Sequence, residues 1–389
     1  MKRLLLTCTD LMAIQFMVPH MRYLSENGFE VELACSVVGN RLEDLQTAVG
    51  DIVKIHTVRL VRSPYSPKNL SGYSDLKKLL EENRYDVIWT NEPVMGVMTR
   101  LAARKARKNG TKVVYMAHGF HFYKGAPLLN WMIWATIEKV MAVHHDLLVT
   151  INQEDYHWAK NHTRSPEVKH INGIGVDMSR QKMSGDSIHS IREMLGVCEG
   201  EIMLLSVGEL QKRKNHESVI RAVSKLNDKS IKYFICGKGV LETYLRQLII
   251  SLHLEDQVFL LGYRQDVLEI MSASDIFIHP SRREGLGLAC LEAMFVGKPL
   301  VTSNVQGIPD YVNNGVTGFL GDPMDIDQYS LNIRRLIDDR DLRDRIGKYN
   351  TVYVQKYLVE NIQQEIAMLL NELICRFETI ENSQMVNNT

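Results

Sequence analysis

Two glutamates, Glu284 and Glu292, stand eight positions apart in the stretch REGLGLACLEAMFVGKPLV, residues 283–301. Between them, Gly285 and Gly287 suit a junction of loop and helix, where unpaired backbone N–H groups and a partial positive charge favour a phosphate. If the helix begins near Gly287, Glu284 lies outside its mouth and Glu292 lies more than one turn inside. Ionised carboxylates only accept hydrogen bonds, so the pair would bind hydroxyl groups on either side of a diphosphate, as in a sugar nucleotide. The simpler alternative is a surface glutamate followed by an ordinary core helix.

A second loop with chemical potential is expected in SVGELQKRKNHE, residues 206–217. Gly208 permits a tight turn after a strand, and Lys212, Arg213 and Lys214 come just before a predicted helix. A cationic loop beside a helix N-terminus suits a diphosphate. A solvated basic turn without a ligand would have the same sequence.

Two short segments are candidates for contact with a nucleotide base. In CGKG, residues 236–239, Gly237 would let a base lie against the backbone after a strand. In LGYR, residues 261–264, Tyr263 and Arg264 end another strand and would offer a ring and a cation. Plain strand-ending turns explain both segments as well.

In the N-terminal half, His118 follows the predicted strand 112–116 within the segment AHGFHFYKG. A histidine at the carboxyl end of a parallel strand lies at the ligand-binding edge of the sheet rather than in its core. His118 is therefore a candidate functional residue, and His121 and Lys124 are weaker candidates in the same segment.

The triplet Asp325-Ile326-Asp327 has the Asp-x-Asp spacing that many sugar-nucleotide enzymes use to bind a metal. It lies at the start of a predicted helix, beyond the loops described above, and aspartate is favoured at helix N-termini. We interpret the triplet as a helix cap and expect no metal site.

Short β-branched or aliphatic runs alternate with longer amphipathic stretches through most of the chain. Such alternation predicts an α/β architecture with parallel, doubly wound sheets. The segment HINGIGVD, residues 170–177, and the polar stretch 178–190 interrupt the pattern and indicate a link between two units. We expect strands at 3–8, 30–35, 53–57, 87–90, 112–116 and 147–150 before this link and at 202–207, 233–236, 257–261, 276–279 and 299–302 after it, with helices at 19–27, 73–82 and 97–109 among them.

These boundaries predict an N-terminal domain over residues 1–175 and a C-terminal domain over residues 176–359. A helix near 360–378 is expected to pack back on the first domain, and residues 380–389 are expected to form a disordered tail. Doubly wound sheets bind ligands at the carboxyl ends of their strands. The candidate loops after predicted strands therefore fall on ligand-binding edges, which we expect to face each other across a cleft.

The bulk composition excludes several classes of protein. A chain of 389 residues that is 45% hydrophobic and 24% charged is typical of a globular protein with two domains. Its 46 basic and 46 acidic residues cancel, which argues against a nucleic-acid binder that works through bulk charge. The longest apolar window, residues 126–137, is too short to cross a bilayer. Six scattered cysteines and a first segment that lacks a signal-peptide pattern predict buried thiols and a cytoplasmic location.

Taken together, these residues resemble the retaining glycosyltransferases of family 4, whose GT-B fold consists of two facing Rossmann-like domains with a cleft between them. The strongest match is EGLGLACLEAMFVGKPLV, which is similar to the family signature of two glutamates separated by seven residues. The resemblance implies that Glu284 contacts the donor sugar, that Glu292 contacts the ribose and that the amides of residues 286–288, Leu286 to Leu288, contact phosphate and sugar. It also implies that His118 lies near the donor sugar.

VGELQKRKN resembles the phosphate loop of the same family, and Lys214 takes the position of the family lysine. Glu209 replaces the usual arginine, so one cation that binds the diphosphate is lost. Arg213 or Lys212 would have to compensate for it.

The loop after the first predicted strand, residues 8–16, lacks the glycine pair found in many relatives. Because this loop would face the acceptor, Asp10 and Gln15 join His121 and Lys124 as candidate acceptor contacts. Together with AHGFHFYKG, the loop more narrowly resembles bacterial capsule and exopolysaccharide transferases, which build lipid-linked repeat units.

The implied activity is transfer of an N-acetylhexosamine or related hexose from a UDP-sugar to a polyprenyl-diphosphate-linked saccharide, with retention of configuration and without a metal. Lys214 and helix N-termini would stabilise the leaving diphosphate, whose own oxygen would act as the base. Two alternatives remain open. A sugar-nucleotide 2-epimerase would turn over its substrate without an acceptor, and a non-catalytic sensor would bind a sugar nucleotide without turnover.

A lipid-linked acceptor implies contact with a membrane surface. A cluster of five cations followed by two tryptophans is a candidate docking face. A solvated helix end explains the same charges, and a buried helix explains the apolar segment that contains the tryptophans. The residues of this face are Arg104, Lys105, Arg107, Lys108 and Lys112 with Trp131 and Trp134.

Overall fold

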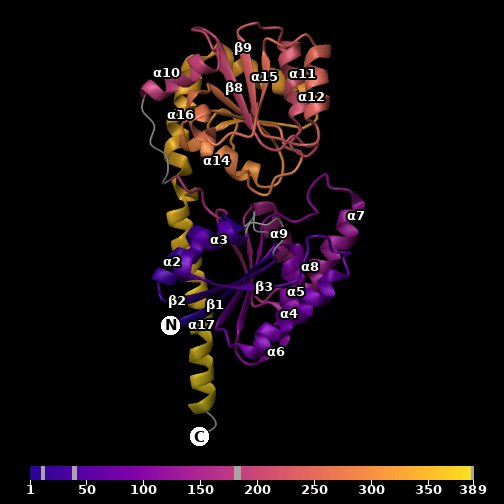
Figure 1. Cartoon of the computed structure of the whole chain (residues 1–389), viewed down its shortest axis with the longest axis vertical. Coiled ribbons are helices and arrows are strands. Elements are labelled where there is room, and N and C mark those ends of the chain that lie inside the picture. Colours follow the sequence, from indigo (N-terminus) through magenta and orange to yellow (C-terminus); the bar gives the residue numbers. More distant parts are fainter. Residues whose placement is uncertain (10–13, 37–41, 179–184, 387–389) are drawn as a thin grey trace. The chain divides into compact units, whose positions relative to one another are not determined.

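The computed structural model describes residues 1–9, 14–36, 42–178 and 185–386. The chain divides into two compact units, one made of Met1–Gly175 with Val359–Thr389 and the other of Val176–Leu358 (Figure 1). Each unit contains one parallel sheet with helices packed against it, and each is described by itself below.

The first unit has a seven-stranded parallel sheet in the order β3-β2-β1-β4-β5-β6-β7. Its central strands β4 and β5 are buried at every residue, as expected for a parallel sheet covered on both faces. The strands are β1 (Lys2–Cys8), β2 (Phe29–Cys35), β3 (Lys54–Thr57), β4 (Val87–Asn91), β5 (Lys112–Ala117), β6 (Leu147–Thr150) and β7 (Val168–His170).

The helices of the first unit include an irregular segment after β5, in which α7 (Leu128–Asn130) continues into the π-helical turn η2 (Trp131–Ala135) and α8 (Thr136–Met141). The others are α2 (Val18–Glu26), α3 (Leu42–Val49), α4 (Lys68–Glu82), α5 (Pro93–Ala102), α6 (Arg104–Lys108), α9 (Gln153–His162) and α17 (Val359–Val386).

The second unit has a six-stranded parallel sheet in the order β10-β9-β8-β11-β12-β13. The strands are β8 (Ile202–Val207), β9 (Ile231–Cys236), β10 (Val258–Gly262), β11 (Ile276–His279), β12 (Leu300–Ser303) and β13 (Gly318–Gly321). The helices are α10 (Gly185–Met194), α11 (His216–Leu226), α12 (Glu242–Ser251), α13 (Val267–Ala273), α14 (Leu288–Phe295), α15 (Ile326–Asp338) and α16 (Arg340–Tyr353).

Both strand orders are those of doubly wound, Rossmann-like sheets, so the predicted fold class of each unit is confirmed. In such sheets the strand order reverses at a switch point, which lies between β1 and β4 in the first unit and between β8 and β11 in the second. Ligands bind beyond the carboxyl ends of the two strands that flank this point.

Two edge strands were not predicted from the sequence. β7 has only three residues, and β13 begins and ends with glycine, so neither shows a long apolar run. A Cβ atom at Gly318 would lie 2.3 Å from the carbonyl oxygen of Leu300, which shows why β13 needs glycine beside β12. The predicted helix 97–109 is instead two helices that meet at Ala103.

The last helix, α17, belongs to the first unit, where Ile366, Leu369 and Leu370 lie beside residues of β4, β5 and β6. It continues to Val386, into the segment 380–389 that we predicted to be a disordered tail. Neither proline nor glycine occurs between Glu360 and Val386, so nothing in the covalent structure ends the helix earlier.

Two further expectations concern the cysteines and a possible membrane span. Cys198 and Cys375 are exposed, contrary to the expectation of buried thiols, because both lie outside the strands that bury Cys8, Cys35 and Cys236. Among the described residues, no helix is both long and apolar enough to span a bilayer.

Candidate functional site

Glu284 and Lys214 meet at the carboxyl edge of the second sheet. Lys214 lies in the loop after β8 and Glu284 lies in the loop after β11, so the two residues follow the strands that flank the switch point. Their side chains are 13% and 15% exposed, and Lys214 Nζ donates to Glu284 Oε2 at 2.6 Å. The sheet order thus brings together two candidates that are 70 residues apart in the sequence.

Three further groups surround the same carboxylate oxygen. Glu284 Oε2 lies 3.1 Å from His279 Nε2, 3.2 Å from Ser281 Oγ and 3.3 Å from Arg213 Nη1. His279 was not predicted, although it ends β11 and so meets the criterion that selected His118 in the other half.

The electrostatics of this group favour an ionised glutamate. Burial alone would raise the pKa of Glu284, but the hydrogen bond from His279 and the charge of Lys214 outweigh it and hold the pKa well below its usual range. Burial and the nearby Lys214 lower the pKa of His279. A neutral imidazole can then donate from Nε2 to the Glu284 carboxylate, which is available as an acceptor for a ligand hydroxyl.

The mouth of α14 has the geometry that the glycine spacing predicted. Gly287 is the residue before the helix and has a φ of 81°, so Glu284 lies outside the mouth. A Cβ atom at Gly287 would lie 2.8 Å from Ile308 Cδ1 and 3.0 Å from the Tyr311 hydroxyl. That hydroxyl donates to the carbonyl oxygen of Leu286 at 2.7 Å and fixes the turn. Glycine is therefore required here both by the backbone angle and by the space.

Glu292 lies inside α14, just over one turn after Leu288. No hydrogen bond to its carboxylate is found among the described residues, and burial raises its pKa. Glu284 differs, because Lys214 and Arg213 form ion pairs with its carboxylate. A partly buried carboxylate without a protein donor is suited to accept hydrogen bonds from a ligand.

The glycine-containing loops after β8 and β9 pack closely against each other through their backbones. A Cβ atom at Gly237 would lie 1.9 Å from the carbonyl oxygen of Gly208, and one at Gly239 would lie 2.5 Å from that of Leu210. Gly208 in turn lies beneath the side chain of Lys214, which would be 3.2 Å from a Cβ atom there. Close backbone packing therefore positions the lysine that contacts Glu284.

The remaining candidates of the second unit have different surroundings. Arg213 Nη2 lies 3.9 Å from Glu209, whose side chain is 55% exposed, while its Nη1 contacts Glu284. Arg264 donates two hydrogen bonds to Asp266, and Tyr263 is 72% exposed. Arg264 already has a carboxylate partner within its own loop, which competes with a role in binding the donor.

In the first unit, His118 lies beyond β5, and its Nε2 is 2.9 Å from Asn91 Oδ1 at the end of β4. Burial lowers the pKa of His118 to about 4, and the neighbouring His20 acts in the same direction. His118 is therefore neutral at pH 7 and, with Nε2 donating to Asn91, keeps its other ring nitrogen as an acceptor.

The candidate acceptor contacts of the first unit are more dispersed. Asp10 lies outside the described residues, and Gln15 is exposed. The ring of His121 is 4.9 Å from that of Trp134, and Lys124 is exposed with its backbone N–H bonded to Glu154.

Asn215 is a positioning residue that we did not predict. It is buried with a left-handed backbone, and its Nδ2 donates to the carbonyl oxygens of Pro280 at 3.1 Å and Pro323 at 2.6 Å. Its Oδ1 accepts from Arg282 Nη2 at 2.9 Å. One side chain therefore ties together the segments after β8, β11 and β13. Asparagine before a helix signals a cap, but partners this distant in sequence leave no local signal.

Glu92 was also missed. It follows β4 with φ 65° and ψ 155°, a conformation that is strained for any residue except glycine. Its carboxylate accepts from the backbone N–H of Thr9 at 2.7 Å and from Arg62 at 3.4 Å. The strain lies at the ligand-binding edge of the first sheet.

The Asp325 triplet has the structural role that we predicted. The Asp325 side chain accepts from the backbone N–H of Gln328 at 2.9 Å and caps α15. Asp327 forms an ion pair with Lys225. Both carboxylates thus have protein partners.

Comparisons with known proteins show which family the chain belongs to. A family model described as "Glycosyl transferases group 1" matches residues 187–352, and one described as "Glycosyltransferase Family 4" matches residues 19–180. The putative glycosyltransferase EpsD of Bacillus subtilis (strain 168) is 33% identical over 337 residues, which cover 86% of each chain. An Escherichia coli protein named UDP-Gal:alpha-D-GlcNAc-diphosphoundecaprenol alpha-1,3-galactosyltransferase is 28% identical over 324 residues, 82% of each chain.

The crystal structure of Anabaena Alr3699/HepE in complex with UDP and glucose superposes with a TM-score of 0.78 at 22% identity, covering 96% of this chain and all of the other. The two Rossmann-like domains are those of the GT-B fold. The chain belongs to glycosyltransferase family 4.

Proposed function

We propose that this chain is a retaining hexosyltransferase that moves a sugar, an N-acetylhexosamine or related hexose, from a UDP-sugar to a polyprenyl-diphosphate-linked saccharide. The observation that carries the proposal is the Lys214–Glu284 pair at the mouth of α14, with a contact of 2.6 Å. It offers a cation for a diphosphate and a carboxylate for sugar hydroxyls within one small site. The name of the E. coli relative and the ligands of the Anabaena complex support the choice of UDP, and the former also supports a lipid-linked acceptor.

The chemistry follows from positioning and charge. As the bond between the anomeric carbon and the diphosphate breaks, negative charge grows on the leaving oxygen, and Lys214 with the N-terminus of α14 stabilises it. The acceptor hydroxyl attacks from the same face and passes its proton to that oxygen. Glu284 orients the sugar through its hydroxyls, and the ionised state of this carboxylate excludes it as a proton donor at neutral pH. No metal is needed for this sequence of steps.

A thermal-shift panel of nucleotide sugars tests the donor assignment. We expect UDP-sugars to raise the melting temperature and GDP-sugars to leave it unchanged, because only a ligand that binds the native state stabilises it. At a concentration 100 times the Kd, the expected stabilisation is about 2.7 kcal/mol. UDP and GDP alone provide the control for recognition of the base. The reverse pattern would overturn the choice of UDP.

Turnover distinguishes the proposal from its two alternatives. A purified lipid-linked saccharide and the donor with the largest shift should give a product whose new linkage keeps the anomeric configuration of the donor, as measured by NMR. A new sugar nucleotide formed without acceptor would indicate an epimerase. Binding without turnover across an acceptor panel would indicate a sensor.

A lipid-linked acceptor requires contact with the membrane, and the predicted docking face has to be revised. Lys112 is buried, Arg107 is paired with Asp146 at 2.9 Å, and Trp131 and Trp134 pack against the core. The basic helix α6 leads into the amino end of β5, whereas the two tryptophans follow its carboxyl end. The cations and the tryptophans therefore lie at opposite edges of the sheet.

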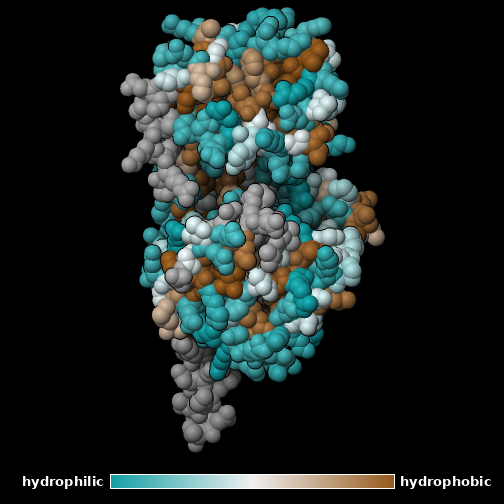
Figure 2. Space-filling model, in the orientation of Figure 1, coloured by the Kyte–Doolittle hydropathy of each residue, from teal (hydrophilic) through white to brown (hydrophobic). Residues whose placement is uncertain are grey.

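The exposed apolar surface is formed instead by Leu128, Leu129 and Met132, which are 82%, 62% and 71% exposed. Figure 2 shows hydrophobic residues gathered over α7, which contains Leu128 and Leu129 and continues into the turn that contains Met132. The exposed Lys124 and Lys139 lie just before and after this apolar patch in the sequence. Apolar side chains flanked by lysines are suited to the surface of an anionic membrane at the inner face of the cell membrane.

We expect the purified protein to co-sediment with anionic vesicles at low salt and to be released at high salt. The double substitution of Leu128→Ser and Met132→Ser should weaken the binding, because it removes apolar area from the interface. Leu70→Ser on α4, at an equally exposed leucine, is the matched control. A failure to co-sediment at low salt would contradict membrane docking.

A further inference from the structure

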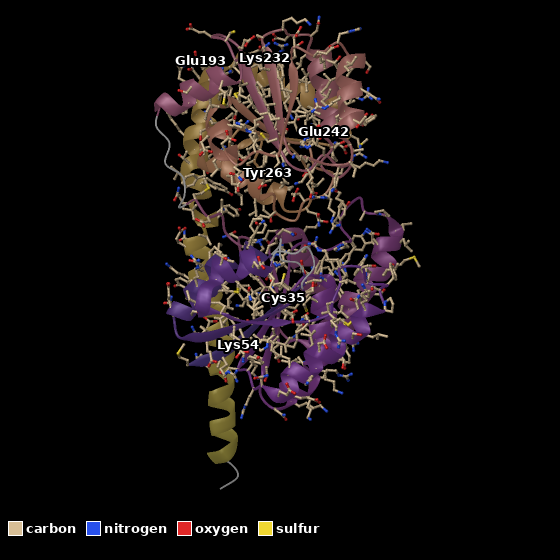
Figure 3. All side chains as sticks on the ribbon, viewed as in Figure 1. Cys35, Lys54, Glu193, Lys232, Glu242 and Tyr263 are labelled. Atoms are coloured by element: carbon tan, nitrogen blue, oxygen red, sulfur yellow. The ribbon has the colours of Figure 1, made fainter. Side chains whose placement is uncertain are left out.

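A cavity of about 660 Å³ lies in the second unit at the amino-terminal edge of the sheet, opposite the edge that carries Lys214 and Glu284. Its walls include Ile202 at the start of β8, Asp275 just before β11 and Lys298 just before β12. In Figure 3, Lys232 near the start of β9 and Tyr263 after the end of β10 mark these two opposite edges. The cavity is therefore separate from the donor site.

The acidic groups of this cavity are already neutralised. Three carboxylates line it, and a cation lies within ion-pair distance of each. The pairs are Asp275 with Arg192 at 3.0 Å, Glu201 with Lys232 at 3.4 Å and Asp344 with Arg340 at 3.9 Å.

Three other cations of the lining remain in excess. Within the described part of the chain, no carboxylate lies within 4.0 Å of Lys298, Arg343 or Lys348. Among the described residues, Arg343 donates to the backbone carbonyl oxygens of Leu336 and Ile337. Burial lowers the pKa of Lys298 to about 8, although the charge of Asp275 acts in the opposite direction, so the ammonium is mostly protonated at pH 7 but poorly solvated. Lys298 and Arg343 are partly buried, and partly buried positive charge without an ion-pair partner is costly unless an anion accompanies it.

Two glycines bring these cations together. A Cβ atom at Gly347 would lie 2.3 Å from the carbonyl oxygen of Gly297, so α16 lies directly against the loop that carries Lys298. Asn350 Nδ2 also donates to the carbonyl oxygen of Lys298 at 2.8 Å and holds the loop on the helix. Lys348, the residue after Gly347, lines the cavity together with Lys298.

We propose that this cavity binds the phosphate groups of a small soluble phosphate ester, at a site distinct from that of the sugar donor. Its volume is within the range of small-molecule sites. Lysine and arginine side chains that lack carboxylate partners are the groups that bind phosphate through charge-assisted hydrogen bonds. The inference goes beyond the proposed transfer reaction and does not depend on it.

The test is isothermal titration of the full chain with inorganic pyrophosphate as the probe. The Lys214→Gln variant suppresses binding at the donor loop, and in this background we expect pyrophosphate binding to persist. Adding Lys298→Gln should weaken it by about tenfold or more, as expected for the loss of a charged hydrogen bond. Lys229→Gln, at an exposed lysine outside the cavity, is the matched control and should have no effect.

If Lys298→Gln lowers the unfolding midpoint, the exposed Lys348→Gln replaces it and should weaken binding by several fold. Unchanged affinity in both variants would overturn the proposal. The same holds if Lys214→Gln alone abolishes all binding of pyrophosphate, because the probe would then bind only at the donor loop.

Discussion

Replacing Lys214 with glutamine is expected to lower kcat by about 10²- to 10³-fold, the usual loss when one preorganised group that stabilises developing charge is removed. The Lys214 ammonium is the cation closest to the Glu284 carboxylate, and close backbone packing of Gly208 and Gly237 fixes its position. The substitution also removes the charge that helps to keep Glu284 ionised. Steady-state release of UDP from the donor chosen by the thermal-shift panel measures the effect.

Lys212→Gln is the matched control, since Lys212 lies in the same loop, is exposed and forms no ion pair with any of the described residues. We expect its kcat to stay within about twofold of the wild type, as for most surface substitutions. Equal losses in both variants would show that the loop contributes only general positive charge. A change confined to KM would show that Lys214 binds ground state and transition state alike.

Gly237→Ala is expected to destabilise the second unit by about 2–5 kcal/mol, from overpacking together with backbone strain. The new Cβ atom would lie 1.9 Å from the carbonyl oxygen of Gly208, and Gly237 has a φ of 154°. The clash is with backbone, so no side-chain rotation relieves it. Urea denaturation followed by circular dichroism measures the change.

Gly196→Ala separates strain from the clash. Gly196 also has a positive φ, 69°, but nothing lies within 4 Å of its expected Cβ position. Its cost should be the backbone term alone, about 1–2 kcal/mol. If both variants lost the same stability, the contact between the loops after β8 and β9 would not be what requires glycine at position 237.

The sequence was most informative where a single loop contains its own signal. Glu284, Gly287 and Glu292 lie on one short segment, and the helix predicted near Gly287 begins at Leu288. The long apolar strands were predicted closely for the same reason, with β8 and β11 found at the expected residues. Buried parallel strands are local apolar runs, and these can be recognised in the sequence without their neighbours.

What could not be predicted depends on contacts between distant segments. Asn215 connects three loops because it donates hydrogen bonds to the carbonyl oxygens of Pro280 and Pro323. Nothing in the sequence around residue 215 indicates that these two distant residues will be its partners. The candidate docking face could not be judged from the sequence because exposure is a tertiary property: Trp131 and Trp134, which were candidates for it, pack on Phe122 and His121. Leu128 and Met132 look like core residues in the sequence and are instead exposed.

The Lys214–Glu284 ion pair makes the proposed donor site selective for a ligand that carries both a sugar and a diphosphate over a ligand that carries only one of them. A free phosphate that binds Lys214 alone weakens the ion pair and leaves the partly buried Glu284 carboxylate without its closest cation. A free sugar that binds Glu284 alone has to compete with the 2.6 Å hydrogen bond from Lys214 Nζ. A ligand with both groups replaces both partners in one event. Sugar and diphosphate are therefore thermodynamically coupled through the protein, and intact donor is favoured over either of its hydrolysis products.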